Sequence, residues 1–245
     1  MRVAVISDIH GNDFGFATAV ADLKTHNVDQ IVCLGDAIQG GPQPAETVKR
    51  LRELDCPVVM GNADAWLLTG VNTGAEGEPS EKQLAVREWS LSQLSEADKT
   101  FISGFQPTVE IDLSGEKKLL CFHGSPTSFD DIIYPTTSLE DFQRFLGAYA
   151  PAIMCGGHTH TQQVRRLGDT FFFNPGSVGF AYDHQQPDGD FRADPWAEYA
   201  ILTHEDGRLG LEFRRVPYNR DNMIAIYMNS GRPYADEAGG QYRGR

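Results

Sequence analysis

Two histidines stand two positions apart in the stretch Gly156-Gly157-His158-Thr159-His160, directly after the apolar run 152–155. In an extended segment, residues i and i+2 point to the same side, so both imidazoles would face one direction. Neutral imidazole is a common transition-metal ligand, and two of them make half of such a site. A His-x-His pair also occurs by accident, so the remaining ligands must come from elsewhere in the chain.

Four further apolar runs are followed by residues of types that commonly bind metals. The motifs that follow them are Asp8-Ile9-His10, Gly35-Asp36, Gly61-Asn62 and His123-Gly124. Carboxylate, amide and imidazole ligands without thiolates are typical of manganese, iron, zinc, cobalt or nickel centres rather than of structural zinc–thiolate sites. Three carboxylate or amide groups and four imidazoles are too many for one tetrahedral ion, and their number suits two metals that share a ligand. The candidate ligands are Asp8, His10, Asp36, Asn62, His123, His158 and His160.

The elements that must position these residues alternate between strands and helices. The apolar runs 2–7, 31–34 and 57–60 predict three short buried strands. Apolar residues at i, i+3, i+4 and i+7 predict a helix over 16–23, and Pro44 is suited to start a second helix. Right-handed crossovers would bring the strand ends to one edge of a sheet, where ligands bind in open α/β folds. We therefore expect the metal-binding motifs to gather at that edge.

The rest of the chain predicts further helices and hairpins. Helices are expected over 82–94, 95–102 and 139–149, and strands over 109–113, 118–122, 152–155, 163–167, 170–173, 198–203 and 209–216. The polar loop 181–195 is either a surface loop or part of an active-site rim. Residues 1–230 are expected to form a single domain, and residues 231–245 a flexible C-terminal tail.

Composition narrows the class of protein. A chain of 245 residues with a formal net charge of -13 has an acidic surface that repels nucleic acids and anionic membranes. Neither polymeric nucleic acid nor a membrane is an expected partner, whereas a small phosphorylated substrate is compatible because bound cations dominate a site locally. No apolar run approaches the roughly 18 residues of a membrane span. The sequence contains no Cys-x-x-Cys pair and no recognisable secretory signal, so buried, reduced cysteines and a cytoplasmic location are expected.

With these motifs in this order, the sequence resembles the calcineurin-like metallophosphoesterase superfamily, and most closely its small bacterial phosphodiesterase-like members. The resemblance covers nearly the whole chain, through Asn174-Pro175-Gly176-Ser177-Val178-Gly179 to the final hairpin near Pro217. It implies an α/β (α+β) fold, a four-layer αββα sandwich of two mixed β-sheets flanked by helices. It also implies two divalent transition-metal ions at the strand ends, with manganese expected and iron, zinc, nickel or cobalt as alternatives.

The resemblance also implies a role for each candidate residue. Asp8, His10 and His160 would hold one metal. Asn62, His123 and His158 would hold the other, and Asp36 would bridge the two. Asn12 and Asn62 would approach the phosphate of the substrate. The implied reaction is hydrolysis of a small phosphorylated substrate, in which a hydroxide that bridges the metals attacks phosphorus in line with the leaving oxygen.

One position departs from the family pattern. Members often have Gly-Asn-His-Asp or Gly-Asn-His-Glu, whereas this chain has Gly61-Asn62-Ala63-Asp64 and lacks the histidine that protonates the leaving group. General acid help is typically worth about 10²–10⁴-fold. Good leaving groups, such as aryl esters or some phosphodiesters, are therefore favoured over alkyl monoesters. The candidate catalytic residues are Asp36, Asn62 and Asp64, with Tyr182 and His184 as alternative proton donors.

Two functions of different classes remain open. The first is a metal-dependent phosphodiesterase or phosphatase that acts on a small substrate. The second is a catalytically weak metal-binding scaffold on the same fold, as in the retromer subunit that resembles these enzymes. The full ligand set favours the enzyme, and an exposed apolar patch away from the metal edge would favour the scaffold. Loop 37–42 lacks the Asp-Arg-Gly run of protein Ser/Thr phosphatases, which disfavours that branch. The sequence leaves a homo-oligomeric state open.

Overall fold

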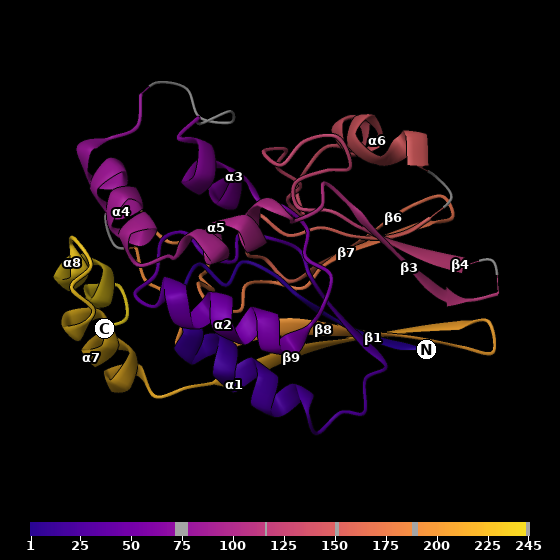
Figure 1. Ribbon diagram of the computed structural model, residues 1–245. Coiled ribbons are helices and arrows are strands. Elements are labelled where there is room, and N and C mark those ends of the chain that lie inside the picture. Colours follow the sequence, from indigo (N-terminus) through magenta and orange to yellow (C-terminus); the bar gives the residue numbers. More distant parts are fainter. Residues whose placement is uncertain (72–77, 116, 150–151, 188–190, 244–245) are drawn as a thin grey trace.

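Two mixed β-sheets lie face to face in the computed structural model, which describes residues 1–71, 78–115, 117–149, 152–187 and 191–243 (Figure 1). The four-stranded sheet has the order β2 (Gln30–Cys33), β1 (Arg2–Ile6), β8 (Trp196–Glu205) and β9 (Arg208–Pro217). The five-stranded sheet has the order β3 (Val109–Ser114), β4 (Lys117–Cys121), β5 (Ile153–Cys155), β7 (Thr170–Asn174) and β6 (Gln163–Leu167). Both sheets contain parallel and antiparallel pairs, so the prediction of two mixed sheets is confirmed.

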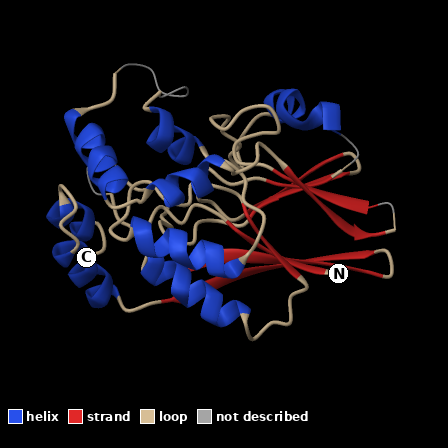
Figure 2. Cartoon of the chain, viewed as in Figure 1, coloured by secondary structure: helices blue, strands red, loops and turns tan. Residues whose placement is uncertain are grey.

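The alternation of side chains along β1 explains the layers. Val3 and Val5 belong to a hydrophobic cluster that also contains side chains of the five-stranded sheet, such as Leu119. Ala4 and Ile6 point the other way, into a cluster with side chains of helices α1 (Asp13–Leu23) and α2 (Pro44–Leu54). A third cluster joins the five-stranded sheet to helix α6 (Leu139–Leu146). Helices thus cover both outer faces, which confirms the four-layer arrangement (Figure 2).

Several helices begin where the sequence predicts. Helix α2 starts at Pro44, whose fixed φ and missing N–H suit a first turn. Ser95 precedes helix α5 (Glu96–Ser103), where its hydroxyl accepts from the N–H of Asp98 and the Asp98 carboxylate accepts from the N–H of Ser95. Helices α3 (Asn62–Thr69) and α4 (Glu81–Ser92) precede it, and a short 3-10 helix (Gly147–Tyr149) extends α6. Within the described ranges, every helix is too short or too polar to cross a membrane.

The predicted third strand, 57–60, is reduced to two isolated bridges. Val58 pairs with the last residue of β2, and Val59 pairs with Gln106. The run cannot continue as a strand because Gly61 is already the N-cap of α3. The polar residues that follow this run nevertheless lie beside the other candidate ligands, as predicted, since the N–H of Ala63 donates to Oδ1 of Asp36 at 2.8 Å.

The C-terminal segment differs from the predicted flexible tail. After β9 the chain forms helices α7 (Arg220–Asn229) and α8 (Ala235–Gly240), which pack against each other. Tyr242 is only 2% exposed, and its hydroxyl donates to the carbonyl of Gly179 at 3.2 Å. Burial of Tyr227 and Tyr242, whose rings lie 5.9 Å apart, holds the segment against the body of the protein. Residues 244–245 of the predicted tail lie outside the described residues.

Candidate metal centre

Six of the seven candidate metal ligands come together in two groups of three. Asp8, His10 and His160 form one group, and Asp36, His123 and His158 form the other; in each group, one ligand atom per residue lies within 4.8 Å of the others. The loops after β1, β2, β4 and β5 supply these side chains. Asn62, the seventh candidate, lies beside the second group, with its Oδ1 3.0 Å from Nε2 of His123.

Asp36 lies between the two groups. Its Oδ2 is 3.4 Å from Nε2 of His123 and 3.7 Å from Nε2 of His10. In the first group, Oδ1 of Asp8 is 3.3 Å from Nε2 of His160. A ligand that two cations share must lie within reach of both ligand groups, and the carboxylate of Asp36 meets this requirement.

Backbone carbonyls orient three of the four imidazoles. Nδ1 of His10 lies 2.9 Å from the carbonyl oxygen of Gln39, Nδ1 of His123 lies 2.8 Å from that of Leu34, and Nδ1 of His160 lies 2.6 Å from that of Phe180. Because a carbonyl oxygen can only accept, each Nδ1 must carry the hydrogen and donate. In the neutral tautomer that this hydrogen bond selects, Nε2 carries no hydrogen and is the atom that can bind a metal, as in metal-binding histidines.

The donor atoms of the first group fit a cation. Nε2 of His10 and Nε2 of His160 are 3.1 Å apart, so in the neutral rings two lone pairs face each other. Oδ1 of Asp8 is fully buried and accepts no hydrogen bond among the described residues, since Nε2 of His160, 3.3 Å away, is outside hydrogen-bonding geometry. A buried carboxylate oxygen without a partner is costly. A divalent cation between these atoms would relieve the repulsion and satisfy the carboxylate oxygen, so the residues present fit the metal that the sequence resemblance implies.

Charges within the second group shift the pKa values in opposite directions. Burial alone would lower the pKa of His123, but the adjacent carboxylate of Asp36 raises it to about 9. Burial would raise the pKa of Asp36, but His123 holds it well below its usual range. Burial and the neighbouring His123 lower the pKa of His158 to about 4, which keeps this imidazole neutral and able to bind a metal.

The backbone of the centre is strained. Positive φ values occur at Asp8 (54°), His10 (50°), Asp36 (49°), His158 (68°) and His160 (50°), five of the nine non-glycine residues with positive φ in the described ranges. Such conformations cost free energy and cluster at functional sites. The extended geometry predicted for the His-x-His pair is therefore wrong. Because both residues adopt left-handed turns, the two imidazoles enter different groups instead of facing one side together.

Asn12, predicted to contact the substrate, and Asp64, a predicted catalytic residue, both bind backbone groups in this structure. Asn12 is buried at the N-cap of α1, where Oδ1 accepts from the N–H of Gly15 and Nδ2 donates to the carbonyl of Gly179. Asp64 is fully buried, and its two oxygens accept from the N–H groups of Ala37 and Ile38, each at 3.0 Å. Both side chains therefore hold the loops that carry the ligands through hydrogen bonds to backbone groups.

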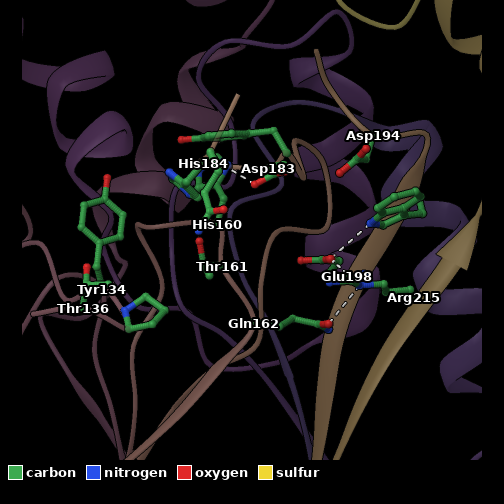
Figure 3. A pocket seen from close by; sticks show the side chains of 14 residues that line it. Tyr134, Thr136, His160, Thr161, Gln162, Asp183, His184, Asp194, Glu198 and Arg215 are labelled. Atoms are coloured by element: carbon green, nitrogen blue, oxygen red, sulfur yellow. Dashed lines mark hydrogen bonds and ion pairs between the residues drawn. The ribbon is translucent and has the colours of Figure 1, made fainter. Parts of the chain in front are cut away.

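Two cavities open beside the centre and share His160 and Tyr182. The larger has a volume of about 750 Å³, and Figure 3 shows Tyr134 on one side of it and Glu198 with Arg215 on the other. The smaller, of about 360 Å³, is lined by both metal groups and by basic side chains from the C-terminal segment and α4. Tyr182 and other residues of loop 181–195 line these cavities, so the described part of this loop belongs to the rim of the site.

Comparisons of the chain with known protein families and solved structures agree with this fold. The family model of the calcineurin-like phosphoesterase superfamily domain matches residues 1–205. An uncharacterized protein of Methanocaldococcus jannaschii is 27% identical over 236 residues, which cover 89% of this chain and 88% of the relative. A metallophosphoesterase from Sphaerobacter thermophilus has a similar structure, with a TM-score of 0.73 and 24% identity over 99% of this chain and 98% of that chain. A hypothetical protein from Pyrococcus horikoshii has a TM-score of 0.80 at 16% identity, covering 100% of this chain and 98% of that chain.

Proposed function

The chain belongs to the calcineurin-like phosphoesterase superfamily, and we propose that it hydrolyses a small phosphodiester with the help of two divalent transition-metal ions, manganese first among them. The observation that carries the proposal is the position of Asp36. Its Oδ2 lies 3.7 Å from Nε2 of His10 and 3.4 Å from Nε2 of His123, so a single carboxylate faces both ligand groups. A pair of metals that share one carboxylate needs this arrangement.

Each ligand then has a defined role. One cation would be held by Asp8, His10 and His160, the other by Asn62, His123 and His158, with Asp36 shared between them. When bound, such a pair supplies Lewis-acid polarisation of the phosphate and a water of lowered pKa. The side chain of Asn62 is also the one that we assign to contact with the substrate phosphate. Asp64 acts as a positioning residue, because it fixes the backbone that follows Asp36.

We assign the proton for the leaving group to Tyr182 rather than to Asp64. The Tyr182 ring lies between His160 and His184, with centroids 5.3 Å and 4.4 Å away, and it lines both cavities. Burial raises the pKa of Tyr182 to about 12, so its hydroxyl keeps its proton at neutral pH. A protonated phenol at the meeting point of the two cavities can donate to a leaving oxygen.

The two cavities favour a diester over a monoester. A phosphodiester carries two substituents, and the cavities of about 750 and 360 Å³ extend from the same pair of side chains, His160 and Tyr182. Each substituent would occupy one cavity while the phosphate lies at the centre. A monoester would leave one of these cavities without a contact to the substrate.

The experiment compares the natural chain with Asp36→Asn, both loaded with Mn²⁺, on bis-p-nitrophenyl phosphate and on p-nitrophenyl phosphate. The natural chain is expected to cleave the diester at least about 100-fold faster than the variant. If the metal-loaded natural chain is no faster than Asp36→Asn on either ester, the proposed activity is wrong. That result would favour the catalytically weak metal-binding scaffold instead.

A further inference from the structure

One arginine that lines the smaller cavity comes from outside the part of the chain that matches the family, residues 1–205. Arg232 lies between helices α7 and α8, which stand beside α4 at the C-terminal end of the molecule (Figure 1). Its Nε donates to the carbonyl of Gly40 at 2.6 Å, and its Nη1 donates to the carbonyl of Pro233 at 2.8 Å. These bonds fix the guanidinium against the loop that follows Asp36.

In the described part of the chain, Arg232 forms no direct ion pair, although the carboxylate of Glu237 is close enough to act on its charge. Among the described residues, no carboxylate oxygen lies within the 4.0 Å ion-pair limit of this guanidinium, and its partners are backbone carbonyls and the ring of Tyr227. Burial lowers the pKa of Arg232, which reflects the cost of holding its charge away from water. In a chain with 34 acidic and 21 basic residues, a half-buried arginine whose acidic neighbour, Glu237, is already paired with Lys82 has room for a further anion.

The cavity that Arg232 lines also contains metal ligands. His10, Asp36, His158 and His160 line the cavity of about 360 Å³ together with Arg232 and Lys82. Lys82, from α4, is already paired with Glu237 of α8. Arg232 therefore remains as the cation in this cavity that can bind a further anion. Its Nη2 has no partner among the described residues, so the two N–H groups on this nitrogen can donate charge-assisted hydrogen bonds to an oxyanion.

We propose that Arg232 forms a second anion subsite, which binds an oxyanion group that the substrate carries in addition to the phosphate at the metal centre. This inference rests on the proposed function, because it places the scissile phosphate among the candidate ligands. The substrate would then be a phosphoester with two anionic groups, of which the second is a phosphate or a carboxylate. The residues of α7 and α8 would thereby determine specificity without taking part in the chemistry.

A binding experiment tests the subsite separately from catalysis. The probes are propane-1,3-bisphosphonate, pentane-1,5-bisphosphonate, 3-phosphonopropionate and the matched single anion propylphosphonate, each titrated by calorimetry into the Mn²⁺-loaded chain. At least one probe with a second anion should bind roughly tenfold or more tightly than propylphosphonate, as expected for charge-assisted hydrogen bonds. A preference for the bisphosphonates indicates a phosphate arm, and a preference for 3-phosphonopropionate indicates a carboxylate arm.

Variants connect this preference to one side chain. Arg232→Gln should abolish the preference, and Arg232→Lys should keep part of it because the charge remains while the bonds that fix the guanidinium to the carbonyls of Gly40 and Pro233 are lost. Arg220→Gln, an exposed arginine of the same segment, is the matched control and should keep it. Equal affinity of the natural chain for all four probes would overturn the inference, and so would an unchanged preference in Arg232→Gln. If Arg232→Gln fails to fold, the natural chain and Arg232→Lys still decide the question.

The two proposals can fail separately. The calorimetric preference does not depend on turnover, so a chain that binds two-anion probes but cleaves no ester would refute only the proposed function. A chain that cleaves bis-p-nitrophenyl phosphate but shows no preference among the probes would refute only the subsite.

Discussion

Gly61 approaches Asp36 so closely that a Cβ added at Gly61 would overlap both the backbone nitrogen and Oδ1 of Asp36. The carboxylate that faces both ligand groups is therefore held in place by the absence of a side chain at position 61. The contact also explains why the N-cap of α3 is a glycine, because a residue with a Cβ would displace the loop that carries Asp36.

Gly61→Ala should weaken metal binding by at least about tenfold, because Asp36 must move away from one of the two groups. The affinity for Mn²⁺ can be measured by titration calorimetry. Gly210→Ala is the matched control, since a Cβ at this position in β9 would have its nearest neighbour at 3.8 Å. Equal affinities of Gly61→Ala and Gly210→Ala would show that the position of Asp36 does not limit metal binding.

Asp64→Asn should reduce the free energy of unfolding by about 1–3 kcal/mol, the cost of leaving a buried donor without its acceptor. Both oxygens of Asp64 accept backbone N–H groups, and asparagine offers one oxygen and one NH₂ group in their place. Urea unfolding of the metal-free protein measures the change. Asp112→Asn, at a side chain that is 88% exposed, should leave the free energy of unfolding nearly unchanged. A steeper dependence of kcat/KM on the pKa of the leaving alcohol, without loss of stability in Asp64→Asn, would return Asp64 to the role of proton donor.

Tyr182→Phe should slow the cleavage of alkyl diesters by about 10²-fold and leave aryl diesters nearly unaffected, because only a poor leaving group needs the proton. The measurement is the dependence of kcat/KM on the pKa of the leaving alcohol. Tyr134→Phe removes a second hydroxyl from the larger cavity, where the Tyr134 ring lies 5.2 Å from that of His184; it serves as the control and should keep the natural dependence. An equal effect of Tyr182→Phe on all esters would assign the hydroxyl to binding instead.

Asp22 should contribute stability that disappears in acid. Burial would raise its pKa, but hydrogen bonds from Tyr199 at 2.5 Å and from Arg214 outweigh burial and lower the pKa below its usual range. A carboxyl group with a lowered pKa stabilises the folded protein fully at any pH above its pKa in the unfolded chain, which is about 3.9. This stabilisation is lost as the pH falls below that value, toward the pKa in the folded protein. The difference in unfolding free energy between the natural chain and Asp22→Asn should therefore be constant near neutral pH and shrink below about pH 4. A difference that stays constant down to pH 3 would contradict this account.

Much of the centre could be predicted from the sequence because its ligands directly follow apolar runs. Asp8, Asp36 and His123 each stand just after such a run, and the order of strands in a sheet then brings the residues together. The positions of Asn12 and Asp64 could not be predicted, since residue type alone does not tell a substrate contact from a capping bond. The same holds for Arg232, because its bond to Gly40 joins residues 192 positions apart and follows no periodic pattern.

The most direct test of the two-metal centre is anomalous diffraction at the manganese edge from crystals grown with Mn²⁺. Two anomalous peaks are expected, one among Asp8, His10 and His160 and the other among Asn62, His123 and His158, with Asp36 contacting both. A single peak, no peak, or a pair of peaks that Asp36 does not bridge would contradict the proposed centre.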